Sequence, residues 1–319
     1  MKLPYGPGDC KAHWFNTAGP CKADLHYMLP PLARLPPLIR LIEQQAYFIL
    51  HAPRQVGKTT TMMALAEQLT ASGRYAAVLL SLEVGAVFPH DPGGAERALL
   101  SEWRQSVRFR LPETLWPPAW PSAESGAVLG TALSAWAEQS PRPLVVFLDE
   151  IDALSGETLM SVLRQLRSGY SNRPHGFPHA LALIGMRDVR DYKLASGGSD
   201  RLQTASPFNI KVESFTLGNF SEDDVTALYA QHTRATGQVF TPEALARAWH
   251  LTDGQPWLVN ALARQATEFL VTDVRQPITA ATIDAAREIL IRRQDTHLDS
   301  LAERLREPRV KALIEPILA

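Results

Sequence analysis

The sequence has few cysteines, no long apolar run and almost no net charge. Two cysteines among 319 residues are too few for a disulfide framework, which favours a reducing compartment such as the cytoplasm. No apolar run approaches the length of a membrane-spanning helix, and residues 1–8 lack the apolar core of a signal peptide. A formal net charge of −1 gives no overall attraction to nucleic acid. We therefore expect a cytoplasmic protein without a membrane partner.

The sequence does contain a phosphate-binding loop, Ala52-Pro53-Arg54-Gln55-Val56-Gly57-Lys58-Thr59-Thr60. It lies between a strand-like run at 47–50 and a helix-like run at 62–69, the order in which backbone N–H groups and a helix N-terminus bind phosphates. We expect the residues from Pro53 to Thr60 to bind ATP. Lys58 would reach the β- and γ-phosphates, and the Thr59 hydroxyl would ligate Mg²⁺. Ala52 replaces the usual first glycine, which is tolerated if its φ is negative.

A second motif follows downstream, where the apolar run 143–148 ends in Asp149 and Glu150. A continuous apolar run is typical of a parallel strand buried on both faces. Its carboxyl end is where open α/β sheets bind ligands. We expect Asp149 to help hold Mg²⁺ and Glu150 to act as the general base that activates water. The two motifs together predict a domain that binds and hydrolyses ATP.

Strands and helices alternate along the first two thirds of the chain, which predicts a parallel sheet. We expect strands at 46–51, 75–82, 143–148, 179–185 and 208–212, and helices at 58–72, 95–110, 127–138 and 156–170. After Ser221 only helix signals occur: a capping box at 221–224, an N-cap at Thr241 before a proline, and a third start at Thr279 or Thr282. The predicted fold class is an α/β, parallel-sheet P-loop core followed by a smaller all-helical lid.

The predicted organisation has four parts. Residues 1–29 form an irregular N-terminal segment, 30–217 the P-loop core and 218–300 the helical lid, while 301–319 begin a further helical unit that is possibly cut short. The proline-rich stretch 111–121 reads as a loop whose tryptophans, Trp116 and Trp120, pack on the domain or face a partner.

The N-terminal segment also holds Cys10, His13, Cys21 and His26. Their spacing matches no zinc finger, so we favour a segment without metal and leave a zinc site open as the alternative.

An α/β P-loop core with an acidic strand and a small helical bundle resembles the AAA+ superfamily and its signalling relatives, the STAND ATPases. The fourth strand ends Leu183-Ile184-Gly185-Met186-Arg187-Asp188, similar to their arginine sensor, which implies that Arg187 reads the γ-phosphate. Gly254-Gln255-Pro256 resembles their GxP motif, which implies that Pro256 packs near the adenine. The alternatives are a surface arginine and a plain helix boundary. The P-loop string also resembles prokaryotic ATPases related to origin-recognition proteins.

The resemblance covers residues 30–270 and has two gaps. Relatives usually continue into a winged-helix domain, whereas this sequence stops at Ala319. The best-placed candidate for an arginine finger that acts across subunits is Arg201. Arg190 and Arg173 are further candidates, and the alternative is that the arginine has a purely structural role.

These observations favour a nucleotide-controlled switch or motor ATPase that acts on a protein or DNA partner and self-associates with ATP. The alternative is a scaffold or sensor module that holds ATP or ADP and hydrolyses little. A P-loop kinase fits less well, because the Asp149-Glu150 pair and the helical lid are not typical of kinases.

Overall fold

The computed structural model describes residues 13–35, 38–186 and 210–293, and its contacts divide the chain into two compact units. One unit, which we call the core unit, spans Pro30–Gly218. The other, the helical unit, combines Met1–Leu29 with Asn219–Ala319. The N-terminal segment thus groups with the helices at the far end of the sequence. The domain limits expected from the sequence stay predictions.

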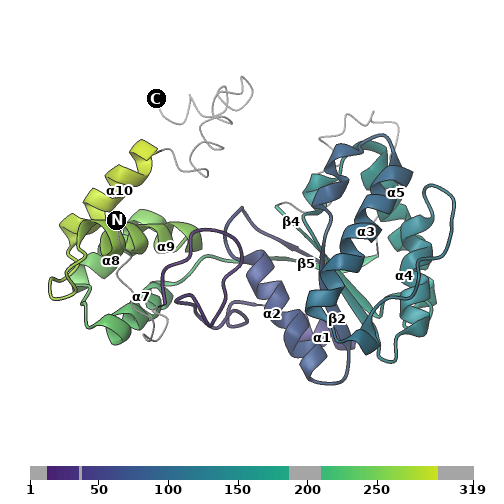
Figure 1. Ribbon diagram of the computed structural model, residues 1–319, viewed down its shortest axis with the longest axis horizontal. Helices are drawn as coiled ribbons and strands as arrows, with labels where there is room; N and C mark the ends of the chain where they lie inside the picture. The colour runs from purple at the N-terminus through teal and green to yellow at the C-terminus, as the bar shows by residue number, and fades with distance from the viewer. Residues whose placement is uncertain (1–12, 36–37, 187–209, 294–319) are drawn as a thin grey trace. The chain divides into compact units, whose positions relative to one another are not determined.

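The core unit is built on a five-stranded parallel sheet with the strand order β2-β3-β4-β1-β5. Figure 1 shows this sheet with its helices. This confirms the predicted α/β class with a parallel sheet. The strands are β1 (Tyr47–His51), β2 (Ala76–Ser81), β3 (Leu144–Asp149), β4 (Ala180–Gly185) and β5 (Lys211–Thr216). The fifth strand was expected at 208–212, so that prediction was wrong by several residues. Among the described strands β5 pairs only with β1 and lies at the edge of the sheet, where polar residues are tolerated.

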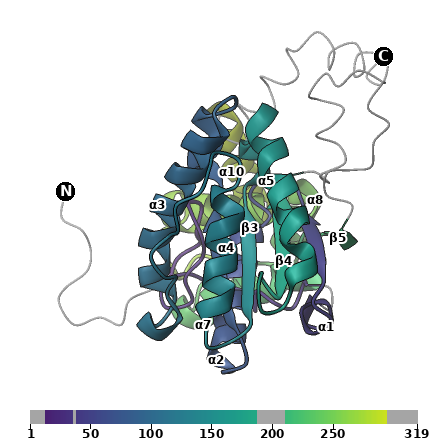
Figure 2. The same cartoon turned by 90° about the vertical axis from the view of Figure 1, so that its right-hand side faces the viewer.

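Helices cover both faces of this sheet. One face packs against α3 (Pro92–Arg110), α4 (Val128–Gln139) and α5 (Gly156–Gly169), which Figure 2 shows side by side. The other face packs against α1 (Leu38–Glu43) and α2 (Lys58–Ala71). β3 and β4 are therefore buried along their whole length, as their continuous apolar runs predict.

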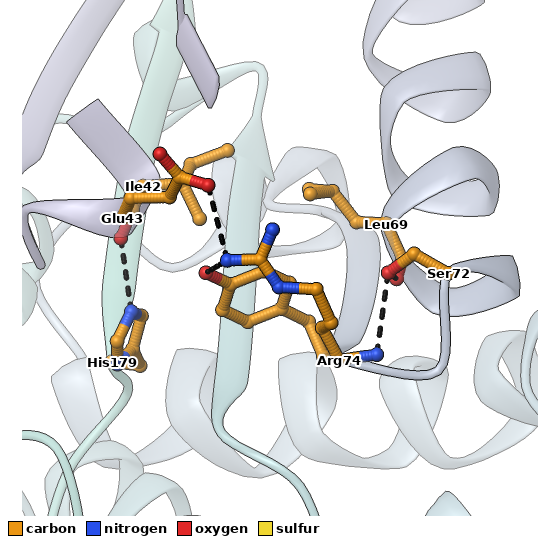
Figure 3. Close-up of polar contacts among 7 residues, drawn as sticks. Ile42, Glu43, Leu69, Ser72, Arg74 and His179 are labelled. Carbon is orange, nitrogen blue, oxygen red and sulfur yellow. Dashed lines mark hydrogen bonds and ion pairs between the residues drawn. The ribbon is translucent and has the colours of Figure 1, made fainter. Parts of the chain in front are cut away.

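Polar contacts join the segments at the edge where the strands begin (Figure 3). Arg74, just before β2, pairs with Glu43 at the end of α1 through an N···O distance of 3.0 Å. His179, just before β4, donates from Nε2 to the Ile42 carbonyl at 2.9 Å. These contacts fix α1 against the sheet at the end where the strands begin, opposite their carboxyl ends.

The proline-rich stretch between α3 and α4 packs on the core unit. The indole of Trp116 donates to the Leu111 carbonyl at 2.9 Å, and that of Trp120 donates to the Leu100 carbonyl at 3.0 Å. Both rings lie partly buried against the main apolar cluster. Of the two roles open to these tryptophans, packing on the domain is therefore the one that these contacts support.

The helical unit contains α7 (Glu222–Thr236), α8 (Pro242–Thr252), α9 (Pro256–Arg264), a π-helical turn (Gln265–Leu270) and α10 (Ala280–Arg293). The expected helix starts are present: Ser221 forms a capping box with Asp224, and the Thr241 side chain caps α8 ahead of Pro242. This confirms the predicted helical region after the core. Among the described residues, no helix is long and apolar enough to span a membrane.

The N-terminal segment forms part of the core of the helical unit. Phe15 is 1% exposed and Tyr27 4%, and their rings contact Tyr229 and His232 of α7. The Trp257 indole donates to the Thr17 carbonyl at 2.9 Å. Residues 13–29 have almost no regular secondary structure, yet they bury aromatic surface that α7 and α9 would otherwise expose.

Candidate functional site

The P-loop follows β1 and leads directly into α2. Gly57 has φ +93°, a left-handed conformation suited to glycine, and Gln55 has φ +61°. Among the described non-glycine residues, positive φ occurs at four positions, and Ala52 is not one of them. Alanine therefore fits where the usual motif has glycine. The N-cap residue of α2 is Gly57, which makes no side-chain cap hydrogen bond, and the N-terminus of a helix is where backbone N–H groups bind phosphate.

Lys58 is the first residue of α2, and its ammonium group is held by the loop itself. Nζ donates to the carbonyls of Ala52 and Pro53, each at 2.8 Å. Burial lowers the pKa of Lys58, while the negative charges of Asp149 and Asp152 oppose that shift. The cation therefore lies within the loop that would surround the phosphates.

Thr59 and Asp149 meet although they come from different elements. The Thr59 hydroxyl donates to Asp149 Oδ2 at 2.7 Å. Asp149, the last residue of β3, is 5% exposed and also accepts from the Glu150 N–H at 3.0 Å through its other oxygen. Burial raises the pKa of Asp149, and the bonds from Thr59 and Glu150 together with the Lys58 charge oppose the rise. A hydroxyl and a carboxylate oxygen so close together are suitable ligands for Mg²⁺.

Glu150 lies beyond the end of β3 in a left-handed conformation, with φ +60° and ψ +42°. Such a conformation is strained for a non-glycine residue and is often found at functional sites. Glu150 Oε2 accepts from the Ser81 hydroxyl at 3.3 Å. Burial, followed by the negative charges of Glu83 and Asp149, raises the pKa of Glu150. A raised pKa suits a carboxylate that must accept a proton near neutral pH.

Three residues near this site were not predicted from the sequence: the acidic residues Asp152 and Glu83, and Ser81, whose hydroxyl contacts Glu150. Asp152 Oδ1 accepts from the Met186 N–H at 2.9 Å and so links the turn after β3 to the end of β4. Ser81 is the last residue of β2, opposite Asp149 in the sheet register, and its hydroxyl also accepts from the Glu83 N–H at 3.1 Å. The signal for Asp152 was its spacing of three residues from Asp149, while Ser81 and Glu83 gave none before the strand pairing was known.

Arg34 was also missed, because it precedes the motif by about twenty residues. Its guanidinium donates to the Val56 carbonyl of the P-loop at 3.1 Å and to the Gly218 carbonyl at 2.8 Å. A β-carbon added to Gly57 would lie 3.1 Å from Arg34 Nη2. Arg34 therefore packs directly on the backbone of the loop.

Some of the expected site residues lie outside the described residues or belong to the helical unit. Arg187, Arg190 and Arg201 lie outside the described residues. Pro256 begins α9 in the helical unit, where it is buried, and its role near adenine stays a prediction. Within the P-loop, Pro53 and Arg54 are exposed, while Val56 is 1% exposed.

Arg173, one of the arginine-finger candidates, is held inside the core unit. Its guanidinium carbon lies 3.4 Å from the centre of the Tyr170 ring and 5.1 Å from that of Tyr47. It also donates to the carbonyls of Tyr170 and Gln45. Since Tyr47 begins β1, Arg173 lies at the edge of the sheet away from the P-loop, and these contacts give it a structural role.

The possible zinc ligands are only partly described, because Cys10 lies outside the described residues. His13 Nε2 lies 3.1 Å from the Ala23 carbonyl oxygen, and His26 Nδ1 accepts from the Lys22 N–H at 2.9 Å. Over the described part of the chain, no group of three or more histidine, cysteine, aspartate or glutamate side chains is arranged to hold a metal.

Comparison with known proteins adds a family match over part of the chain. Residues 48–186 match the model of the ATPase family associated with various cellular activities (AAA), a range that includes the P-loop and the acidic end of β3. No curated protein matches the sequence.

Among solved structures, the Walker-type ATPase PABY2304 of Pyrococcus abyssi is similar with a TM-score of 0.58 and 14% identity, covering 85% of this chain and 74% of that one. RuvB T158V of Thermotoga maritima reaches 0.47 with 14% identity over 79% and 65%, and Aeropyrum pernix ORC1 in complex with DNA reaches 0.45 with 16% over 79% and 64%. This chain thus spans less than two thirds of the length of the last two proteins. At these identities the first likeness describes the fold alone, and the other two add no argument.

Proposed function

We propose that this chain, whose residues 48–186 match the AAA family of ATPases, uses its nucleotide state as a switch acting on a protein or DNA partner. The chain is a nucleotide-dependent ATPase. The observation that carries the proposal is the 2.7 Å hydrogen bond between Thr59 and Asp149, with Glu150 as the next residue. It joins a phosphate-binding loop and a candidate general base into one site.

We propose the following roles for the residues of the P-loop. The N–H groups at the start of α2 and the Lys58 ammonium bind the β- and γ-phosphates of ATP, and the loop residues from Pro53 to Thr60 surround them. Thr59 and Asp149 would hold Mg²⁺, which would neutralise charge on the phosphate oxygens. Lys58 exchanges its bonds to the Ala52 and Pro53 carbonyls for bonds to phosphate oxygens.

Glu150 acts as the general base in this proposal. It accepts a proton from water as the water oxygen bonds to the γ-phosphorus, and the bond from that phosphorus to the bridging oxygen breaks to give ADP and phosphate. The Ser81 hydroxyl holds the carboxylate in place. Raising the pKa of Glu150 favours proton acceptance, because a base whose pKa lies nearer the working pH is more effective.

Other parts of the proposal rest on the family resemblance. Arg187 would contact the γ-phosphate and Pro256 the adenine, in the manner of STAND proteins. We also propose that the chain self-associates when ATP is bound and that it lies in the cytoplasm. Sedimentation velocity of Glu150→Gln protein with ATP tests self-association: larger species are expected with ATP than with ADP, and a monomer in both would exclude an oligomer built by this chain alone.

Small-angle scattering tests the switch. We expect the profile of Glu150→Gln protein saturated with ATP to differ from that of the unaltered protein saturated with ADP, because hydrolysis removes the γ-phosphate contacts. The Lys58→Ala protein serves as the control and should respond to neither nucleotide. Identical profiles in the two nucleotide states would instead favour a scaffold that only holds nucleotide.

A further inference from the structure

The chain passes between its two units twice, once after Leu29 and once after Gly218. Arg34 lies a few residues after the first crossing. The second crossing lies just after β5, where the core unit ends. Two chain segments therefore join the units, and Arg34 contacts the second of them.

On the core side, Arg34 connects the crossing to the P-loop. Nη1 donates to the Gly218 carbonyl at 2.8 Å, and Nη2 donates to the Val56 carbonyl at 3.1 Å. The neighbouring Leu217 N–H donates to the carbonyl of His51, at the end of β1, at 3.1 Å. A planar guanidinium can bond two acceptors at once in a fixed geometry, which an ammonium group does less well.

On the helical side, both crossings are also fixed close to the junction. The side-chain amide of Gln231 donates to the Met28 carbonyl and accepts from the Met28 N–H, each at 3.0 Å. The Phe220 N–H donates to the Gly254 carbonyl at 2.9 Å.

What remains between these anchors is short. On the first crossing, residues 29–33, Leu29 packs on the apolar cluster of the helical unit and Leu32 on one of the core unit. On the second, the link from Gly218 to Asn219, the Asn219 side-chain amide donates to the Asp253 carbonyl at 2.9 Å. Gly218 is exposed, with open space around its α-carbon.

We propose that Arg34 is a positioning residue that couples phosphate binding in the P-loop to a two-stranded hinge at residues 29–33 and 218–219. The inference rests on the proposed function, since it requires nucleotide at the P-loop. Its physical basis is that the Val56 carbonyl and the Gly57 N–H belong to the same peptide group. A phosphate that accepts from this N–H polarises the carbonyl and strengthens its bond from Arg34. The strengthened bond draws Arg34, and with it the Gly218 carbonyl, toward the loop.

Coupling of this kind is reciprocal. Nucleotide should tighten the hinge, and loss of the Arg34 bonds should weaken nucleotide binding. The Lys58 ammonium and the backbone N–H groups of the loop remain in Arg34 variants, so the dissociation constant for ADP should rise by about tenfold, the low end of what one hydrogen bond to a charged group contributes.

Amide hydrogen exchange of the full chain tests the inference, with ADP and Mg²⁺ as the probe and calorimetry to measure binding. In the unaltered protein we expect ADP to slow exchange in a peptide covering residues 215–222. In Arg34→Ala and Arg34→Lys, ADP should still bind while this protection falls several-fold, with Arg34→Lys intermediate because its ammonium keeps the charge but does not hold both carbonyls in a fixed geometry. Arg40→Ala, at an exposed arginine of α1, is the matched control and should keep the full effect.

The outcomes separate the inference from the proposed function. If the unaltered protein binds ADP but exchange at 215–222 does not change, the coupling is wrong and the nucleotide site stands. Equal protection in Arg34→Ala and unaltered protein overturns it in the same way. If the unaltered protein binds no more ADP than Lys58→Ala protein, the proposed function fails and the inference fails with it.

Discussion

The hydroxyl of Thr59 donates a 2.7 Å hydrogen bond to Asp149, so the first turn of α2 and the end of β3 meet at one pair of oxygen atoms. The two residues are 90 positions apart in the sequence. Parallel strands that end at the same edge of the sheet bring them together. The pair is suited to a hard divalent cation, and we therefore propose that ATP hydrolysis depends on Mg²⁺.

Thr59→Ala should increase the Mg²⁺ concentration needed for half-maximal ATP hydrolysis by about tenfold or more, since even an outer-shell ligand partner is worth 10–100-fold in metal affinity. Thr59→Ser keeps the hydroxyl and should behave like the unaltered protein. Titration of ATPase activity with MgCl₂ measures the effect. If Thr59→Ala needs the same Mg²⁺ concentration for half-maximal activity as the unaltered protein, Thr59 is not a ligand of the metal.

Stability of the core unit should depend on Glu96, a carboxylate of α3 with no exposed surface. It accepts from the N–H groups of Gly126 and Val128 at the start of α4 and from the side chains of Ser161 and Gln165. Glu96→Ala removes the acceptor of the buried Val128 N–H and of three further donors, among which Gln165 Nε2 keeps a bond to Ser161 Oγ at 3.0 Å. The free energy of unfolding should therefore fall by about 3 kcal/mol.

Chemical denaturation checks this value, with Glu124→Ala as the control at an exposed glutamate near the same helix start. The control should change the free energy of unfolding by about 0.5 kcal/mol or less. Equal effects of the two variants would mean that the Glu96 bonds contribute nothing.

Gly254 and Gly237 provide a matched pair in the helical unit. Both are left-handed, with φ +66° and +81°, so alanine at either site should cost about 1–2 kcal/mol in backbone strain. A β-carbon on Gly254 would lie 1.9 Å from the Phe220 carbonyl oxygen, whereas at Gly237 nothing lies within 4 Å. Gly254→Ala should therefore be the more destabilising by roughly 1–3 kcal/mol in thermal or chemical unfolding. Equal losses would show that Phe220 moves aside without penalty.

His179 should make the protein acid-sensitive. The ring is buried, its Nε2 donates to the Ile42 carbonyl, and its Nδ1 has no hydrogen-bond partner within the described parts of the chain. Burial, together with the charges of Arg173 and His175, lowers the pKa of His179 in the folded state. The unfolded chain then binds a proton more readily than the folded one, so stability falls as pH decreases below about 6.5 toward the folded-state pKa.

Unfolding measured at pH 7.5 and at lower pH checks this sign. In His179→Leu the lost bond to Ile42 should lower stability at neutral pH, but the further loss on acidification should be smaller than in the unaltered protein. His90→Leu, at an exposed histidine, is the control. An unchanged pH dependence in His179→Leu would assign the acid sensitivity to other groups.

The P-loop and the acidic end of β3 could be predicted because their signals are local. Each combines an apolar strand with a short polar motif, and the pattern fixes both the element and the end at which the motif lies. The same reasoning failed at β5, whose edge position allows Lys211, Glu213 and Ser214 in the strand, so no continuous apolar run marks its limits.

Contacts between distant segments could not be predicted. The burial of Phe15 and Tyr27 depends on aromatic rings more than 200 residues away. Residues 13–29 have no helical or strand periodicity from which this burial could be predicted. Ser81 reaches Glu150 only through the pairing of β2 with β3, and Arg34 reaches Val56 only through the fold of the segment before α1. Periodicity identifies elements, whereas these residues owe their place to how the elements pack.

The central claim is that ATP is hydrolysed at this P-loop with Glu150 as the base. The most direct measurement is phosphate release by the unaltered and Glu150→Gln proteins, made alongside ATP binding to each. We expect Glu150→Gln to bind ATP with nearly unchanged affinity and to release phosphate about 10²–10⁴-fold more slowly. Phosphate release by Glu150→Gln at the rate of the unaltered protein would contradict the account.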